Sequence, residues 1–184
     1  GSLKQSSKDL LLLLDTNTQD KALVQADEQL DIDLVLAQCI EAFTIRIAHL
    51  LRPGKDWIKY TVYDAPLIVG STLSYTKCFE CLILFSYQCL FSRKAQGIRI
   101  ELNASKDHIL IDFINDGSQM LQEKCVELRS SAMVDLSAFH VKDQKHILWL
   151  WHALSILEPA SAHLSIQSES GNNALKLQIP INAP

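Results

Sequence analysis

The segment 109–114, apolar except for Asp112, ends in Asn115-Asp116-Gly117, and no further glycine follows until Gly171. A strand that ends in two polar residues and a glycine often begins a ligand site, because glycine lets the backbone approach a ligand closely. Nucleotide sites usually need more than one such glycine. The sequence therefore predicts the frame of a nucleotide site that lacks part of the backbone needed to hold its ligand.

Composition predicts one well-packed domain. The chain has 184 residues, 48% of them hydrophobic, which is enough for a sizeable core and a short appendage. A formal net charge of −4 argues against a general nucleic-acid binder. The longest apolar run, 10–14, is far too short to span a bilayer, there is no signal peptide, and Gly1-Ser2 resembles a tag remnant. The five cysteines are odd in number and irregularly spaced, which does not fit a disulfide framework. We therefore expect a reducing, cytoplasmic setting, which the cytoplasmic part of a membrane sensor would also provide.

Hydrophobic periodicity predicts alternating helices and strands. Helical periods mark the segments 3–14, 33–50, 72–91, 120–136 and 145–157, with Ser71 or Thr72 as the cap of the third. Period-two alternation or a short apolar run marks strands at 57–63, 67–70, 98–102, 108–114, 163–168 and 174–179, and a further short strand fits 30–34. This order predicts an α+β, two-layer α/β sandwich with a mixed sheet and its helices on one face.

Four segments carry a resemblance to a known family. They are 66–73 (Pro-Leu-Ile-Val-Gly-Ser-Thr-Leu), 97–102 (Gly-Ile-Arg-Ile-Glu-Leu), 163–171 (His-Leu-Ser-Ile-Gln-Ser-Glu-Ser-Gly) and 177–180 (Leu-Gln-Ile-Pro). In this order they resemble the catalytic, ATP-binding domain of sensor histidine kinases, which has the Bergerat fold. On this resemblance, residues 1–20 are a tag remnant and the end of a dimerisation helix, residues 21–29 a linker, and residues 30–184 the histidine kinase-like ATPase domain.

The resemblance also shows where the chain departs from the family. The family's Mg²⁺-coordinating asparagine, aligned on the segment 97–100, falls on Gln88. Glutamine carries the same amide on a longer stem, and an octahedral Mg²⁺ site is sensitive to such a shift.

This chain departs further from the family at the positions of the family's two glycine motifs. In the family's Asp-x-Gly-x-Gly motif the aspartate accepts a hydrogen bond from adenine. Here Asn115 replaces that aspartate, Gly117 is kept, and Gln119 replaces the second glycine. The family's phosphate-binding Gly-x-Gly-x-Gly falls on 145–149, which has no glycine and ends in Trp149, a side chain large enough to fill the phosphate position.

We therefore expect a degenerate domain with no catalytic residue, no metal and no cofactor. It would serve two-component signalling as a non-hydrolysing interaction or phosphotransfer scaffold. The resemblance implies a response-regulator receiver domain or another kinase as its partner, a homodimer formed through the N-terminal helix of the parent protein, and no direct contact with nucleic acid or membrane.

Two other functions remain open at this stage. The first is a divergent but active kinase domain that still binds ATP and Mg²⁺ through Gln88 and Asn115. The second is a sensor whose vacated pocket takes a small apolar molecule, with Cys89, Phe91, Met120 and Trp149 as its lining.

Each of these motifs also has a purely structural interpretation. Asn-Asp-Gly favours a tight turn without any ligand. The pair Cys78-x-x-Cys81 has no second pair to complete a zinc site, so buried, inert thiols are expected. The segment 120–136 is expected as an ordered helix packed over the site, and Trp149 and Trp151 are expected in the core.

Overall fold

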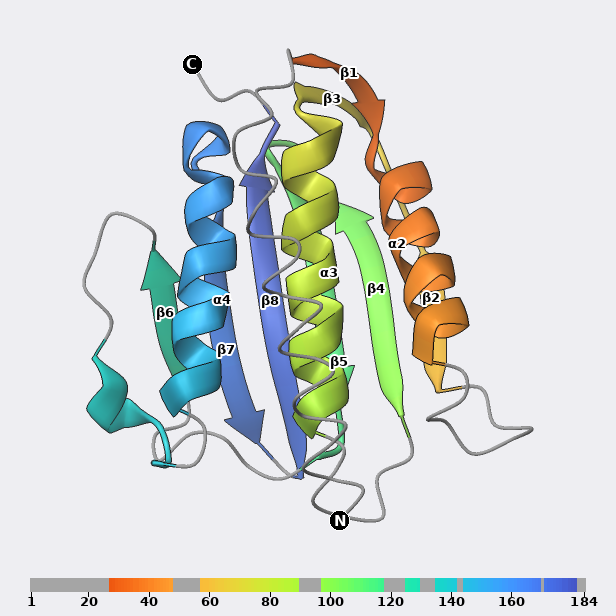
Figure 1. The fold of residues 1–184 in the computed structure, drawn as a ribbon. Coiled ribbons are helices and arrows are strands. Elements are labelled where there is room, and N and C mark those ends of the chain that lie inside the picture. Colours follow the sequence, from red (N-terminus) through yellow and green to blue (C-terminus); the bar gives the residue numbers. More distant parts are fainter. Residues whose placement is uncertain are drawn as a thin grey trace.

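The computed structural model describes residues 27–47, 57–89, 97–117, 125–129, 135–141, 144–169 and 171–181. The predicted N-terminal helix, most of the predicted linker, Phe91, Gln119 and Met120 lie outside the described residues. Within them, a layer of helices lies against one face of a β-sheet, as predicted (Figure 1).

The elements follow each other in an order close to the predicted one. They are β1 (Glu28–Asp31), α2 (Ile32–Ile47), β2 (Ile58–Val62), β3 (Leu67–Gly70), α3 (Thr72–Gln88), β4 (Ile98–Ala104), β5 (His108–Asn115), β6 (Cys125–Arg129), α4 (Gln144–Ile156), β7 (His163–Glu169) and β8 (Asn172–Pro180). Short 3₁₀ turns lie at Leu136–Ala138 and Glu158–Ala160.

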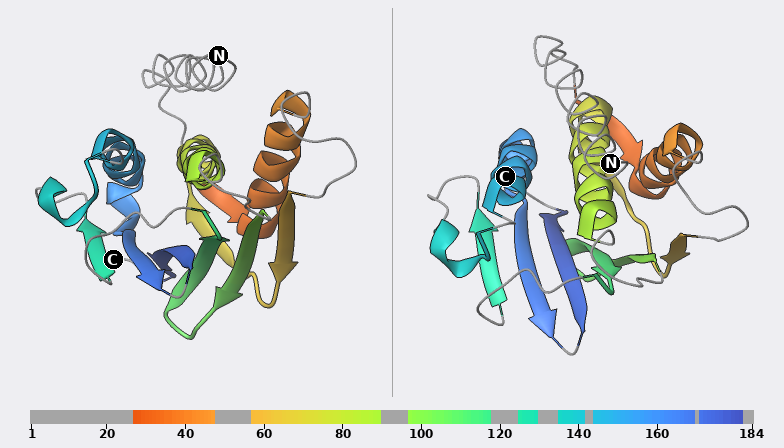
Figure 2. Two further views of the ribbon diagram at one scale, coloured as in Figure 1. Left: turned by 90° about the horizontal axis from the view of Figure 1, so that it is seen from below. Right: turned by 60° about the horizontal axis from the view of Figure 1, so that its bottom comes forward.

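Six strands form the main sheet in the order β2-β4-β5-β8-β7-β6. β2 runs parallel to β4 and the other neighbours are antiparallel, so the sheet is mixed, as predicted. β1 and β3 form a separate antiparallel ribbon. The helices α2, α3 and α4 lie on one side of the main sheet, and no helix of the described residues covers the other side (Figure 2).

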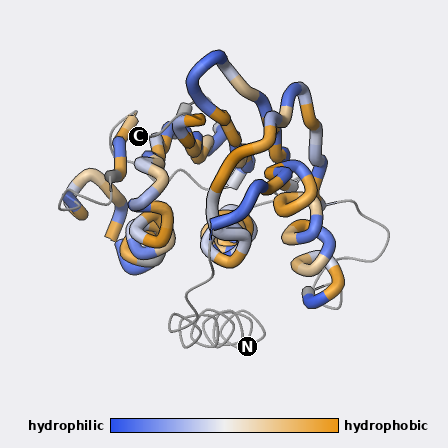
Figure 3. The backbone as a smooth tube through the Cα atoms, turned by 90° about the horizontal axis from the view of Figure 1, so that it is seen from above, coloured by the Kyte–Doolittle hydropathy of each residue, from blue (hydrophilic) through white to orange (hydrophobic). Residues whose placement is uncertain are grey.

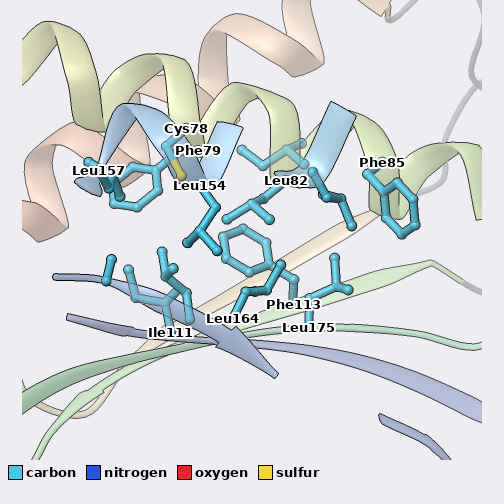
Figure 4. Close-up of a cluster of buried hydrophobic side chains, with 14 of the residues drawn as sticks. Cys78, Phe79, Leu82, Phe85, Ile111, Phe113, Leu154, Leu157, Leu164 and Leu175 are labelled. Atoms are coloured by element: carbon cyan, nitrogen blue, oxygen red, sulfur yellow. The ribbon is translucent and has the colours of Figure 1, made fainter. Parts of the chain in front are cut away.

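The core lies between the sheet and α3 and α4. Alternate residues of β5 are buried, as the period-two pattern predicts, with Phe113 fully inaccessible to solvent. Phe79 and Leu82 of α3 and Leu154 of α4 lie opposite these strand residues (Figure 4). Burying each such side chain contributes about 1.5–3 kcal/mol. Since this face is apolar on both elements, it holds α3 against the centre of the sheet.

Local signals in the sequence account for several element boundaries. Ser71 is the N-cap of α3, and its hydroxyl accepts a hydrogen bond from the Ser74 amide at 3.3 Å, as predicted. α4 ends at Ile156, just before Glu158 and Pro159, which is also where the sequence predicts its end. Each helix mixes hydrophobic and hydrophilic positions (Figure 3), and none in the described part of the chain is long and apolar enough to cross a membrane.

One predicted element is wrong. The sequence predicts a helix over 120–136, but Cys125–Arg129 is the edge strand β6, paired antiparallel with β7. Val126 and Leu128 alternate with the exposed Glu127, which is a strand pattern within a longer stretch of mixed residues. Pairing with Leu164 and Ile166 of β7 buries Leu128, and this non-local contact decides the structure. An ordered helix over the site is therefore excluded for these residues.

Candidate functional site

The structure brings the predicted site residues to one end of the sheet. Gln88 is the last residue of α3, Asn115 is the last residue of β5, and Gly117 follows two residues later. The segment 145–149 forms the first turns of α4 at the same end, at the bottom of Figure 1. The side chain of Trp149 lies outside the described residues, so its predicted place in the phosphate site remains a prediction.

Asn115 belongs to a buried network of hydrogen bonds. Its Oδ1 accepts from the Gly117 amide and from Asn173 Nδ2, both at 3.1 Å. The Oδ1 of Asn173 in turn accepts from the Ser168 hydroxyl at 2.7 Å. Asn115 and Asn173 are each 1% exposed, and Ser168 is also buried. The carbonyl oxygen that would accept a hydrogen bond from adenine is therefore already engaged by two donors within the protein.

Gly117 has a structural reason to be glycine. A Cβ atom at this position would lie 2.1 Å from the carbonyl oxygen of Cys89, the residue that caps the end of α3. Its φ is not positive, so space rather than backbone conformation excludes a side chain. The glycine therefore lets the end of β5 lie directly against the end of α3.

Asp116 also has a role within the fold. Its carboxylate accepts a hydrogen bond from the Gly97 amide at 3.4 Å, which joins the end of β5 to the start of β4. The next residue, Ile98, donates its amide to the Trp57 carbonyl at 2.7 Å. All three residues of the Asn-Asp-Gly turn thus make contacts that need no ligand, in agreement with the structural interpretation of the turn.

Gln88 is different, because its side-chain amide has no partner in the protein. Both Nε2 and Oε1 are buried and make no hydrogen bond. Buried amides in native proteins are almost always hydrogen-bonded to protein or water. The two aligned residues with a described side chain are Gln88 and Asn115, and of these only Gln88 makes no side-chain hydrogen bond.

The segment that the resemblance aligns with the phosphate loop forms the start of α4. In place of a glycine loop, the backbone over 145–149 is helical, and Ile147 is fully buried. Gln144 Nε2, at the helix start, donates to the carbonyls of Leu136 at 3.0 Å and Phe139 at 3.4 Å. The rings of Phe85 and His146 meet edge to face with centroids 6.4 Å apart. The Phe85–His146 contact joins α3 to α4 near this end of the sheet.

His146 does not supply a positive charge to this region. Burial lowers the pKa of its imidazole, and the neighbouring charge of Lys145 lowers it further. The ring is therefore held in its neutral form near neutral pH. A neutral ring against Phe85 offers no charge to an anion, and the loss of phosphate binding stays a prediction.

The described cysteines differ in exposure: Cys39 and Cys78 are buried, Cys81 and Cys89 half-buried, and Cys125 exposed. Burial raises the pKa of the Cys39 and Cys81 thiols to about 12. No group of three or more His, Cys, Asp or Glu residues in the described part of the chain is placed to hold a metal ion. Of the pair Cys78 and Cys81, which the sequence predicts to be buried, Cys78 is buried in the core and Cys81 is half-buried.

A pocket that sequence reasoning missed opens at the same end of the sheet. It has a volume of about 340 Å³ and is lined in part by Lys59, Arg99, Asn115 and Asp116. Lys59 and Arg99 are register partners on β2 and β4. In the sequence, each of these two basic residues alternates with more buried strand residues, which indicates that each points away from the core. Only the pairing of β2 with β4 places the two side by side.

Replacing Gly117 tests the contact between β5 and α3. We expect Gly117→Ala to lower the free energy of unfolding by about 2–3 kcal/mol, because the new methyl group would overlap a backbone carbonyl. Urea unfolding measures the change. Gly171→Ala is the control: a Cβ added there would have no atom within 4 Å and only the positive φ is strained, so a loss of about 1 kcal/mol is expected. Equal losses of unfolding free energy in the two variants would contradict the close approach of Gly117 to the Cys89 carbonyl.

Replacing His146 tests its neutral state. A histidine whose pKa is lowered in the folded state binds fewer protons there than in the unfolded state. Its contribution to stability is therefore complete above the unfolded pKa of 6.5 and is lost as the pH falls below that value. We expect wild type to lose more stability than His146→Gln between about pH 7.5 and pH 5.5 in urea unfolding. His108→Gln is the control, and an unchanged pH dependence in His146→Gln would contradict the assignment.

Comparisons with known proteins concern the fold. A scan against protein-family models gives no match, and neither does a search of curated proteins. Among solved structures, the catalytic domain of histidine kinase ThkA matches with a TM-score of 0.59 at 10% identity, covering 87% of this chain and 100% of that domain. The ATP-binding domain of PrrB from Mycobacterium tuberculosis matches with a TM-score of 0.58 at 15% identity, covering 86% and 100%.

The Acinetobacter baumannii histidine kinase AdeS matches with a TM-score of 0.57 at 11% identity, covering 95% of this chain and 77% of that protein. At sequence identities this low, the structural similarity shows a shared architecture. The order of elements, the mixed sheet and its helix-covered face all agree with it. This chain therefore has the fold of the catalytic, ATP-binding domain of histidine kinases.

Proposed function

We propose that this domain serves two-component signalling as a non-hydrolysing interaction or phosphotransfer scaffold. The observation that carries the proposal is the engagement of Asn115 Oδ1 by two internal donors. A nucleotide with an exocyclic amino group needs a free acceptor at this position, and this acceptor is saturated. An asparagine is also a weaker acceptor than a carboxylate, because its hydrogen bonds are not assisted by charge.

The phosphate end supports the same proposal. Phosphate sites rely on backbone amides at a helix N-terminus that a ligand can approach. Here a helical turn, the buried Ile147 and the Phe85–His146 contact take that place. Binding ATP in the manner of the fold's active members would require moving this packing, at the cost of the apolar contacts between α3 and α4.

A scaffold acts through its surfaces and its partners. The fold suits a receiver domain or another kinase as the partner, and the leucine-rich segment 3–14 suits dimerisation of the parent protein through a helix. A cytoplasmic setting belongs to the same proposal. None of these roles needs hydrolysis of ATP.

Calorimetry with a non-hydrolysable ATP analogue and Mg²⁺ tests the proposal. We expect no saturable heat with this domain, while an active histidine kinase catalytic domain titrated in parallel shows binding. The physical reason is the saturated acceptor at Asn115 and the helical packing of the segment aligned with the phosphate loop. Micromolar affinity for the analogue would contradict the proposal.

A second function, a divergent ATP-binding kinase domain, is favoured by one observation. The Gln88 amide is buried and unpaired, so its Oε1 remains available as a ligand for a metal ion that bridges phosphates. If the domain binds ATP through this residue, Gln88→Ala should weaken the binding at least about tenfold, because one hydrogen-bonding or metal-ligating oxygen is lost. Gln38→Ala, on the exposed side of α2, is the matched control. Nucleotide binding unaffected by Gln88→Ala would place the ligand elsewhere.

A further inference from the structure

The pocket of about 340 Å³ opens on the face of the sheet that lies away from the helices (Figure 2). Lys59 of β2 and Arg99 of β4 line it and are register partners. Ile98 and Ile100, which alternate with Arg99, are buried in the core, so the two basic side chains point to the uncovered face. Like charges held side by side repel each other, and a negative group placed between them would relieve this repulsion.

The two basic side chains keep an excess of positive charge. Arg99 Nε forms an ion pair with Glu101 Oε1 at 3.2 Å, and a guanidinium has further N–H donors on its two terminal nitrogens. Within the described part of the chain, Arg99 makes no other ion pair and the Lys59 ammonium makes none. One positive charge is therefore left over at this end of the pocket after Glu101 is counted.

Backbone and apolar side chains form the rest of the pocket near the basic pair. Gly97 lines it without a side chain, and its φ of +149° favours glycine. A Cβ atom on Gly97 would also lie 2.5 Å from the carbonyl oxygen of Trp57, so no side chain fits there. Trp57 and Ile114 add apolar surface to the lining. The pocket thus joins a positive end to an apolar wall.

A carboxylate lies at the other end of the same pocket. Asp116 lines it, and its Oδ1 accepts a hydrogen bond from the Gly97 amide at 3.4 Å. Gly97 lies two residues before Arg99, which places this carboxylate roughly 7 Å along the strand from the basic pair. An α-amino acid carries its carboxylate and ammonium on one carbon, and hydrogen bonds of about 2.8 Å at each end give it a similar span.

We propose that this pocket binds a zwitterionic α-amino acid with an apolar side chain. The ligand carboxylate lies between Lys59 and Arg99, and its ammonium lies against Asp116. The ligand side chain contacts Trp57 and Ile114. A simple anion would bring no positive group to Asp116, and a simple cation would be repelled by the basic pair, so the pocket favours a ligand that carries both charges. The volume suits such a ligand, since small-molecule sites usually measure roughly 300–1,000 Å³.

Three leucine derivatives test the charges of the ligand separately. L-Leucine carries both charges, N-acetyl-L-leucine lacks the positive one, and L-leucinamide lacks the negative one. At about pH 6.5, where the free amines are protonated, we expect L-leucine to give saturable shifts of the Gly97 and Arg99 backbone amide signals in NMR titrations of the wild-type domain. The other two compounds should bind at least about tenfold more weakly, because each lacks one charge-assisted hydrogen bond.

Two substitutions assign the charges to residues. Lys59→Gln should weaken L-leucine binding about fivefold or more and leave L-leucinamide binding unchanged, since only the carboxylate loses a partner. Asp116→Asn keeps an oxygen for the Gly97 amide and should weaken L-leucine binding similarly, while N-acetyl-L-leucine binding does not fall. Lys176→Gln is the control: it removes the same charge from the same face of the sheet, but Lys176 does not line this pocket. L-Leucine binding should be unchanged in this variant.

Several results would overturn the proposal. They are an absence of saturable shifts with L-leucine, equal affinity for L-leucine and N-acetyl-L-leucine (an anion site only), or equal effects of Lys59→Gln and Lys176→Gln. The three-compound titration uses wild-type protein, so it decides the matter even if a variant does not fold. The proposal does not depend on the scaffold function. The ATP-analogue titration with Mg²⁺ tests that function, and the leucine series tests this pocket.

Discussion

The packing of α3 against the inner face of the sheet is the constraint on which the rest of the structure depends. Phe79 and Leu82 of α3 face Ile111 and Phe113 of β5 across the core, and burial of these side chains holds the helix above β5 (Figure 4). With α3 at this height, its last carbonyl contacts Gly117, which leaves no room for a side chain there. The geometry of the whole candidate site is therefore a consequence of core packing.

The same packing places side chains at the positions that the resemblance aligns with a nucleotide site. At the end of α3, Phe85 meets His146 of α4, and this contact joins the two helices near this end of the sheet. At the end of β5, the buried Asn115–Asn173–Ser168 network uses the acceptor that a base would need. Nδ2 of Asn115 and both amide atoms of Gln88 remain buried without a hydrogen-bond partner in the protein.

Much of the fold could be predicted from the sequence because its signals are local. Alternation in 98–102 and 108–114 predicted the central hairpin, and Ser71 predicted the start of α3, since each depends on neighbouring residues. The segment 120–136 was predicted wrongly because its residues fit a helix locally, whereas pairing of 125–129 with β7 is a contact between residues about forty positions apart. The Phe85–His146 contact, between two helices, had no local signal either.

The sequence by itself determined the α+β class, most element boundaries and the absence of glycine where a phosphate loop would be. It determined these because periodicity, caps and glycine positions are properties of short segments. Only the tertiary structure decided which atom of Asn115 is engaged and which is free, since that depends on Gly117 and on Asn173 of a distant strand. It also decided that Gly117 serves packing, because the clash that excludes a side chain comes from Cys89 of a separate element.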